Sequence, residues 1–133
     1  MIRRNSHQII PITVASAGQK IEFNGKSTKT EHKLVKGVFA VVSNDAGGIS
    51  DPDVGSTIAL NIDSIDVLVE NFDIALIKKD KTIPIGYLPY KFETPVKAGG
   101  TEIKGYYQDG SLTGVTYPYT VKLYLETEYD ATN

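Results

Sequence analysis

The chain has 133 residues, of which 41% are hydrophobic and 23% charged; its net charge is −2, and it contains no cysteine. This size and composition predict one globular domain, 1–133, that needs neither a disulfide nor a metal to fold. The lack of cysteine excludes disulfides, thiolate metal sites and thiol catalysis. No apolar run approaches the ~20 residues of a membrane-spanning helix.

The first element along the chain is an interrupted strand over residues 7–14. Its β-branched side chains favour extended backbone, but Pro11 removes a backbone donor, so we expect an edge strand or a bulge. A short strand at 20–24, with a turn on either side, follows. We expect residues 1–18 to form an extended N-terminal arm that becomes ordered when the chain assembles with its partners.

The strongest strand signal lies at residues 34–43, a nearly continuous apolar run that is typical of a strand buried on both faces. Gly37 within this run indicates a bulge or the close approach of another backbone. After a loop at 44–55, residues 56–63 alternate between apolar and polar side chains, as a strand with one buried face does. A further strand is predicted at 65–69, after a break in the pattern.

Residues 71–79 are compatible with either a short helical turn or a strand, because short apolar runs do not distinguish the two. Residues 82–90 contain two prolines and a glycine, which leave at best a broken edge strand. The last three strands are predicted at 92–96, 101–108 and 120–128.

These elements number about eight, with several long connections between them. They predict an all-β fold: an antiparallel two-sheet β-sandwich of the jelly-roll or Greek-key type, with at most one or two short helical turns. Nine side chains that alternate along three of the strands are expected to face the core: Val38, Ala40, Val42, Ile58, Leu60, Ile62, Val121, Leu123 and Leu125.

Charge is divided unevenly along the chain. The first 36 residues hold seven basic and two acidic side chains, whereas residues 37–133 hold seven lysines and fourteen acids. Chance clustering on a solvated surface would explain this division. Alternatively, the basic end meets an acidic surface, on a neighbouring copy or on a nucleic acid. Because no three basic residues are consecutive, tight binding to nucleic acid is not expected.

No arrangement of residues typical of catalysis is visible, so we expect a non-enzyme without a cofactor. The two histidines, His7 and His32, belong to no catalytic motif and are expected at the surface or in loops. The loop containing Asp45, Asp51 and Asp53 is the best calcium candidate, because calcium prefers hard oxygen ligands. Its spacing does not match an EF-hand, and Asp, Gly and Pro are also ordinary turn residues.

Tyrosines are frequent in the C-terminal half. Exposed tyrosines suit contact with a protein or a sugar, whereas half-buried ones cover the core, and the sequence leaves both roles open. The tyrosines in question are Tyr87, Tyr90, Tyr106, Tyr107, Tyr117 and Tyr119.

The layout of the chain resembles that of the single jelly-roll proteins of icosahedral virus shells. The features that carry the resemblance are a polar, basic segment through Lys33, a hydrophobic strand at 34–43, alternating strands after it, and a terminal strand at 119–128. The resemblance implies a virion component, such as a vertex or minor capsid protein of a tailless phage. Such a protein would pack edge to edge with copies of itself or with a major coat protein. Many shell proteins hold the genome with a denser basic arm than this chain has.

The alternative is a carbohydrate-binding or adhesive β-sandwich, secreted or displayed at a cell surface, that would use the tyrosines and the candidate calcium loop. If the chain is a structural protein of a virus shell, we expect it to contact neighbouring subunits through its two N-terminal arginines, the proline of its edge strand and several tyrosines. These candidates are Arg3, Arg4, Pro11, Tyr87, Tyr90, Tyr117 and Tyr119.

Overall fold

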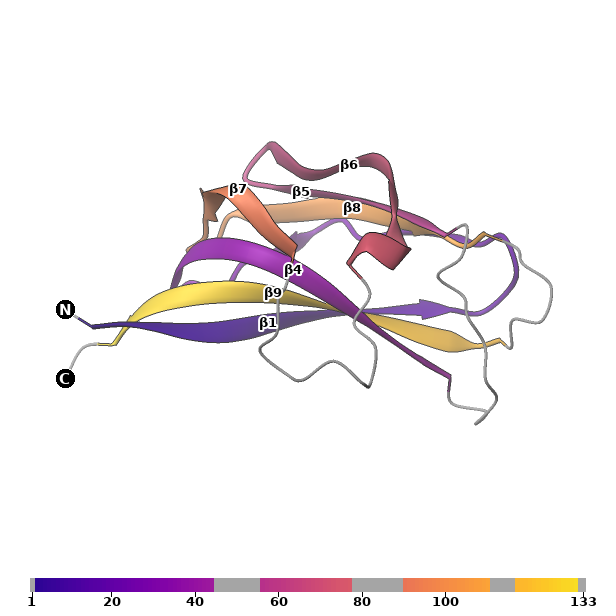
Figure 1. The fold of residues 1–133 in the computed structure, drawn as a ribbon, viewed down its shortest axis with the longest axis horizontal. Helices are drawn as coiled ribbons and strands as arrows, with labels where there is room; N and C mark the ends of the chain where they lie inside the picture. Colours follow the sequence, from indigo (N-terminus) through magenta and orange to yellow (C-terminus); the bar gives the residue numbers. More distant parts are fainter. Residues whose placement is uncertain (1, 45–55, 78–89, 111–116, 132–133) are drawn as a thin grey trace.

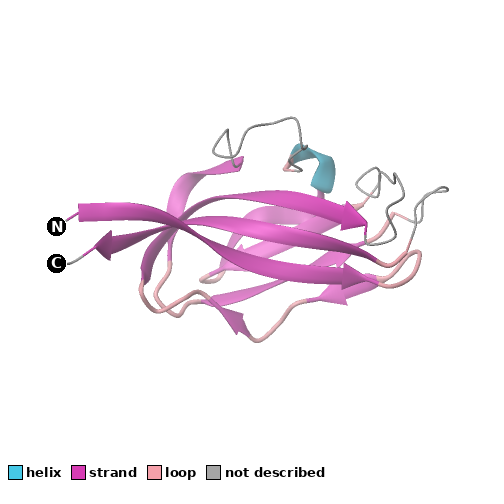
Figure 2. Cartoon of the chain, turned by 90° about the horizontal axis from the view of Figure 1, so that it is seen from below, coloured by secondary structure: helices cyan, strands magenta, loops and turns pink. Residues whose placement is uncertain are grey.

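The computed structural model describes residues 2–44, 56–77, 90–110 and 117–131. Within these residues, nine strands form two antiparallel sheets that pack face to face (Figure 1). One short 3-10 turn is the only helical element in the described part of the chain, and Figure 2 shows it in cyan beside the strands. The predicted all-β sandwich is therefore confirmed.

Each sheet is built from strands that are distant in the sequence. Sheet A runs in the order β1 (Ile2–Val14), β9 (Tyr119–Ala131), β4 (His32–Asn44) and β7 (Tyr90–Lys97). Sheet B runs in the order β2 (Lys20–Glu22), β8 (Glu102–Gln108), β5 (Thr57–Ile62) and β6 (Ile65–Asp73), and β3 (Lys26–Ser27) also pairs with β8.

The pairing of the strands is that of one long hairpin rolled up on itself. β1 pairs with β9, β2 and β3 pair with β8, β4 pairs with β7, and β5 pairs with β6. The first half of the chain thus pairs with the second half in reverse order. Because β2 and β3 occupy a single strand position, the fold has the eight positions of a jelly roll, as the sequence predicts.

The tip of this rolled hairpin is the turn between β5 and β6. Asp63 and Ser64 both have positive φ, 53° and 62°, between the paired residues Ile62 and Ile65. Two central residues with positive φ define a type I′ turn, whose twist matches that of the flanking strands. The break in the sequence pattern after residue 62 is this turn.

The core lies between the two sheets and consists of the alternating residues predicted from the sequence. Eight of the nine predicted core side chains are buried, and the ninth, Val42, is half-buried and packs against the others. β1 and β8 add further buried residues, among them Ile10, Ile12 and Ile103. The predicted faces of the three central strands are confirmed.

Two glycines allow neighbouring backbones to approach closely. At Gly37 the register of β4 shifts against both β7 and β9, and a Cβ atom there would collide with the Tyr90 carbonyl oxygen. A Cβ atom at Gly105 on β8 would collide with the Ala59 carbonyl oxygen on β5. The bulge predicted at Gly37 is confirmed, and each glycine permits a strand pairing that a side chain would prevent.

Residues 2–14 do not form the extended arm that the sequence analysis predicts for 1–18. They form β1, which pairs with β9 from Ile2 opposite Ala131 to Val14 opposite Tyr119. The composition of this segment is basic and polar, but its inward side chains contribute to the core, and its partner strand is at the other end of the chain. The prediction that Pro11 marks an edge strand is confirmed, because β1 is the first strand of sheet A.

The segment 71–79, for which the sequence allows a strand or a helical turn, contains both. β6 continues to Asp73, and the 3-10 turn η1 (Ile74–Leu76) follows it directly. The Ile74 N–H donates to the Ser56 carbonyl at 3.2 Å, and the Ala40 N–H donates to the Ile77 carbonyl at 2.8 Å. η1 therefore ties β6 to β4 and closes the space between the sheets. Residues 82–89 of the predicted broken strand lie outside the described residues.

The assigned faces of β9 can be tested by truncating one side chain on each face. Leu123→Ala should lower the free energy of unfolding by about 2–5 kcal/mol, because it leaves a cavity in a core position that is fully buried. The neighbouring exposed residue provides the control: Lys122→Ala should change this free energy by less than about 0.5 kcal/mol. Denaturant unfolding followed by circular dichroism measures both, and equal losses would contradict the assignment.

Candidate functional site

Three of the C-terminal tyrosines gather around one buried carboxyl group at an end of the sandwich. Asp109, which follows β8, is only 3% exposed. Its Oδ1 accepts a hydrogen bond from the Tyr119 hydroxyl at 2.5 Å, and its Oδ2 accepts one from the Tyr117 hydroxyl at 2.6 Å. The Tyr107 and Tyr119 hydroxyls lie 3.0 Å apart, within hydrogen-bond distance. This arrangement satisfies the buried polar atoms.

The same carboxyl group connects three parts of the fold. The Gly18 N–H, in the turn between β1 and β2, donates to Asp109 Oδ2 at 2.9 Å, and the Asp109 N–H donates to the Gln19 carbonyl at 3.0 Å. The network thus joins the β1–β2 turn, the end of β8 and the start of β9. Its role is structural, so the prediction of a subunit contact is corrected for Tyr119, which is wholly buried; Tyr117 is half-buried beside it.

Burial and hydrogen bonding keep the tyrosine protons in place. Burial raises the pKa of Tyr119 and of Tyr107 above the ordinary value of 10.0. Burial, followed by the hydrogen bond to Asp109, raises the pKa of Tyr117 to about 12. These hydroxyls therefore remain neutral donors at physiological pH.

The network predicts a loss of stability in alkali. The folded protein holds the Tyr117 proton to a higher pH than the unfolded chain does. The resulting contribution to stability is complete below pH 10.0 and is lost as the pH rises through about 12. Denaturant unfolding at a series of alkaline pH values should show this decline, and Tyr117→Phe should make it shallower. An unchanged slope in the variant would contradict the assignment of Tyr117.

The two histidines differ from each other in environment. His7 is exposed on β1, as predicted, and its ring meets those of Phe39 and Tyr124 edge to face, at centroid distances of 5.8 and 6.3 Å. His32 is 3% exposed, which corrects the prediction of a surface or loop position. Burial lowers the pKa of His32, so the ring is neutral over a wider pH range than a surface histidine.

Of the predicted site residues other than the tyrosines, three lie on β1 and the rest lie outside the described residues. Arg4 and Pro11 are exposed on β1, and Arg3 belongs to the same strand. In the described ranges, no three His, Cys, Asp or Glu side chains are grouped so that they could hold a metal ion. The candidates outside these ranges are Tyr87 and the possible calcium ligands Asp45, Asp51 and Asp53.

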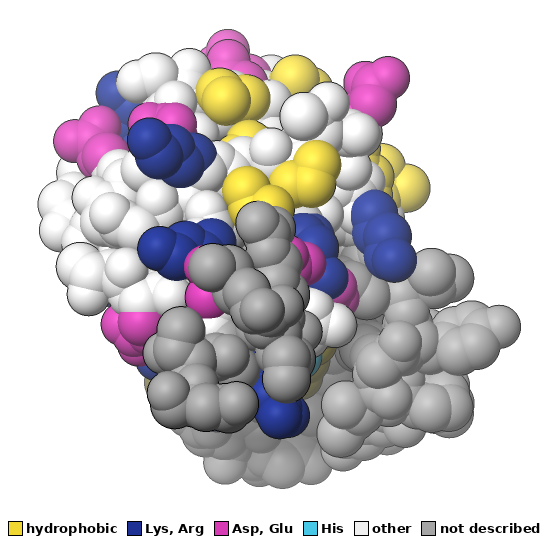
Figure 3. Space-filling model, turned by 90° about the vertical axis from the view of Figure 1, so that its left-hand side faces the viewer, with side chains coloured by type: hydrophobic (Ala, Val, Ile, Leu, Met, Phe, Trp, Pro, Cys, Tyr) yellow, Lys and Arg dark blue, Asp and Glu magenta, His cyan; other side chains and the backbone are white. Residues whose placement is uncertain are grey.

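The clearest concentration of exposed apolar side chains lies along β6, η1 and β7, which we call the β6–β7 edge. Four large hydrophobic residues are strongly exposed there: Ile65 (49%), Val69 (62%), Leu76 (68%) and Tyr90 (40%). Figure 1 places β6 and β7 along the top of the molecule, and Figure 3 shows hydrophobic side chains exposed toward that side. Of the six predicted contact residues that the structure describes, Tyr90 is the one that lies on this edge.

A groove of about 290 Å³ runs between the two strands of the β6–β7 edge. The Phe72 and Tyr90 rings meet edge to face across the two sheets, at a centroid distance of 5.4 Å. The groove is lined by Ile65, Asp66, Val67, Tyr90, Phe92, Glu93, Thr94 and Val96. Among the described strands, β6 is the last of sheet B and β7 the last of sheet A, so each has a neighbouring described strand on one lateral side only.

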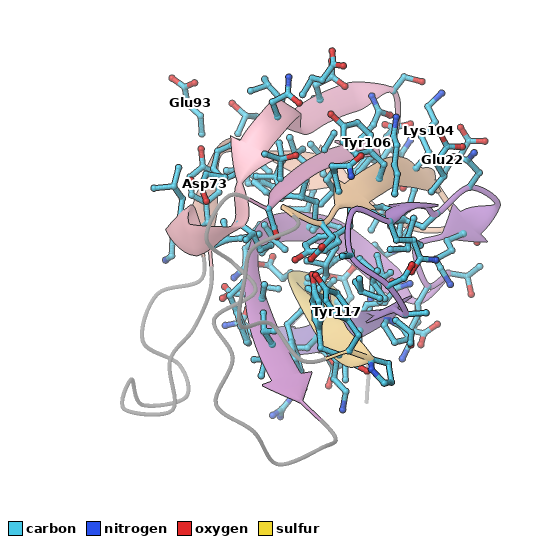
Figure 4. All side chains as sticks on the ribbon, turned by 90° about the vertical axis from the view of Figure 1, so that its right-hand side faces the viewer. Glu22, Asp73, Glu93, Lys104, Tyr106 and Tyr117 are labelled. Atoms are coloured by element: carbon cyan, nitrogen blue, oxygen red, sulfur yellow. The ribbon has the colours of Figure 1, made fainter. Side chains whose placement is uncertain are left out.

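The β6–β7 edge is acidic. β6 holds three carboxylates and no basic residue, and β7 holds one carboxylate and two lysines. Asp66 accepts a hydrogen bond from the Asn61 side-chain amide at 2.9 Å, which fixes one carboxylate at the rim of the groove. Figure 4 shows Asp73 and Glu93 on one side of the sandwich, while Glu22, Lys104 and Tyr106 lie on the opposite side.

Sequence reasoning missed most of this edge. Residues 65–69 read as a short apolar strand, and nothing local indicated that Ile65 and Val69 would face solvent. Their exposure results from the position of β6 at the end of sheet B, which is set by long-range pairing. The available signal was an apolar strand followed by Glu70 and Asp73, acidic residues of the kind that protect exposed edges from uncontrolled pairing.

Comparison with known proteins finds no match to the chain among family models, curated proteins or solved structures. In the described ranges, no helix has the length and apolar character needed to cross a membrane. The β6–β7 edge is therefore the feature of the described residues that bears on function.

Proposed function

We propose that this chain is a non-enzymatic structural protein that assembles with other chains as a component of a virus shell. Its partners are copies of itself or a major coat protein, and it works through the β6–β7 edge. The observation that carries the proposal is that four of the five strongly exposed large hydrophobic residues in the described chain gather there.

Exposed apolar residues on a soluble protein are informative when they cluster. Single ones are ordinary, but a contiguous apolar patch with a polar rim typically marks an interaction site. The β6–β7 edge has this form, since Ile65 and Tyr90 line a groove whose rim carries Asp66 and Glu93, and Val69 is exposed further along β6. Burial of such side chains against a partner removes them from water, which favours association.

The fold alone is compatible with two classes of protein, because jelly rolls occur in viral capsid proteins and in lectins. The positions of the tyrosines favour the first class. A sugar-binding site needs exposed aromatic faces, whereas Tyr107 and Tyr119 are wholly buried and Tyr117 donates its hydroxyl proton to Asp109. Tyr90 is exposed, but its ring packs edge to face against Phe72. The surface feature that the described residues offer is the long apolar edge, which suits a protein partner.

The proposal predicts that one substitution on the β6–β7 edge prevents association without unfolding the chain. Val69→Lys places a charge on a strongly exposed position of β6, so the fold should be retained while association is lost. The control Thr120→Lys adds the same charge on the outer face of sheet A and should leave association intact. Sedimentation velocity, alone and with proteins from purified particles, measures association, and circular dichroism checks the fold.

A second measurement separates the proposal from carbohydrate binding. Mass spectrometry of gradient-purified virus particles from the source should find peptides of this chain in the particle fractions. If the chain is absent from particles, stays monomeric with its natural partners present and is retained on a polysaccharide column, the carbohydrate-binding alternative replaces the proposal.

A further inference from the structure

The two lateral sides of the jelly roll are different surfaces. The strand orders place β6 and β7 on one side, and β1 with β2 and β3 on the other. We call the second side the β1–β3 edge. The Gln8 side chain holds this edge together, since its amide donates to the Ser27 carbonyl at 2.9 Å and its oxygen accepts from the Lys29 N–H at 3.1 Å. Figure 1 shows β1 along the bottom of the molecule, away from β6 and β7.

The two edges carry opposite charge. Residues 2–31, which form the β1–β3 edge, include five basic and two acidic side chains, a net charge of +3. The strands of the β6–β7 edge include four acidic and two basic side chains, a net charge of −2. Arg4, Lys26 and Lys29 are exposed on the first edge, and Glu70 and Glu93 are exposed on the second. The edges therefore attract each other, and each repels a copy of itself.

Exposed hydrophobic residues are also found on both edges, but most of them lie on the acidic one. Four of the five strongly exposed large hydrophobic residues lie on the β6–β7 edge, and the fifth, Ile9, lies on β1 and is 50% exposed. Pro11, two residues further along β1, is exposed beside it. The β1–β3 edge thus offers two exposed apolar residues on a strand that also carries basic ones. They complement the exposed apolar residues and carboxylates of the β6–β7 edge.

We propose that the acidic β6–β7 edge of one copy binds the basic β1–β3 edge of a second copy, so that the chains associate head to tail. This inference rests on the proposed function and specifies the partner surface. A contact between two different surfaces leaves one of each unused on every dimer, so association continues until it closes into a ring or extends as a filament.

The edge strands also determine the kind of contact. Pro11 provides no N–H for a hydrogen bond along the outer side of β1, so a continuous sheet through β1 of one copy and β7 of the next is interrupted there. The contact is therefore formed by side chains, with the apolar residues at its centre and the charges around them. A contact with charges at its rim weakens as ionic strength rises.

A charge-exchange experiment tests the pairing of the two edges. Glu93→Lys makes the β6–β7 edge less negative and Lys26→Glu makes the β1–β3 edge less positive, so each variant alone should associate at least about tenfold more weakly than the unaltered chain. In an equimolar mixture, the two variants can alternate. The unaltered basic edge of the Glu93→Lys variant then meets the unaltered acidic edge of the Lys26→Glu variant, so association should return. Sedimentation velocity at low and high salt measures each case.

The control variants place the same changes on the outer face of sheet B, one strand in from the β1–β3 edge. Glu102 and Lys104 lie on the outer face of β8, inside sheet B, and form an exposed ion pair at 3.6 Å. Glu102→Lys and Lys104→Glu should leave association within about twofold of the unaltered chain, because exposed pairs contribute little. Circular dichroism of all four variants verifies that they are folded.

The outcomes separate this inference from the proposed function. If Glu93→Lys weakens association but Lys26→Glu does not, the β6–β7 edge binds a different surface; the head-to-tail pairing is then wrong, while the proposed function stands. The same holds if the unaltered chain is a monomer alone but associates with proteins from purified particles through Val69. If neither self-association nor association with particle proteins occurs, both proposals are wrong.

Discussion

The sandwich depends on one strand, β9. It lies between β1 and β4 in sheet A, so without it the first strand of the chain has no partner in that sheet. Its inward side chains, Val121, Leu123 and Leu125, are fully buried. At its start, Tyr119 donates to Asp109 and thereby fixes the end of β8 and the β1–β2 turn. β9 therefore contributes to the pairing of sheet A, to the packing of the core and to the closure of one end of the fold.

The central strands and the lateral edges have separate roles. Central strands have neighbours on both sides, and their alternation fills the core, so they account for stability. Each edge strand has one neighbour among the described strands, so part of its surface is open to solvent. β1 has Pro11 and basic residues, whereas β6 has carboxylates beside exposed Ile65 and Val69. Substitutions on the edges can therefore alter association without disturbing the fold, which makes the functional proposals testable.

The sequence predicted what is local and missed what depends on distant pairing. The alternating faces of β5 and β9, the bulge at Gly37 and the edge position of Pro11 follow from side-chain periodicity and backbone chemistry, and the structure has them all. The predicted arm over residues 1–18 was wrong because β1 pairs with a strand more than a hundred residues away. The sequence did not single out Asp109, because its tyrosine partners, Tyr117 and Tyr119, come from a later segment that reaches it only in the folded sandwich.

The pairing of β1 with β9 also constrains how the chain folds during synthesis. Ile2 pairs with Ala131, so the ribosome must have made β9 before β1 can meet its partner. Until then Ile10, Ile12 and Val14 have no β9 beside them, and the nascent chain carries an unpaired apolar strand. Closing so long a loop is intrinsically slow and leaves the intermediate prone to aggregation. A chaperone that holds the N-terminal strand during translation would raise the yield of folded protein.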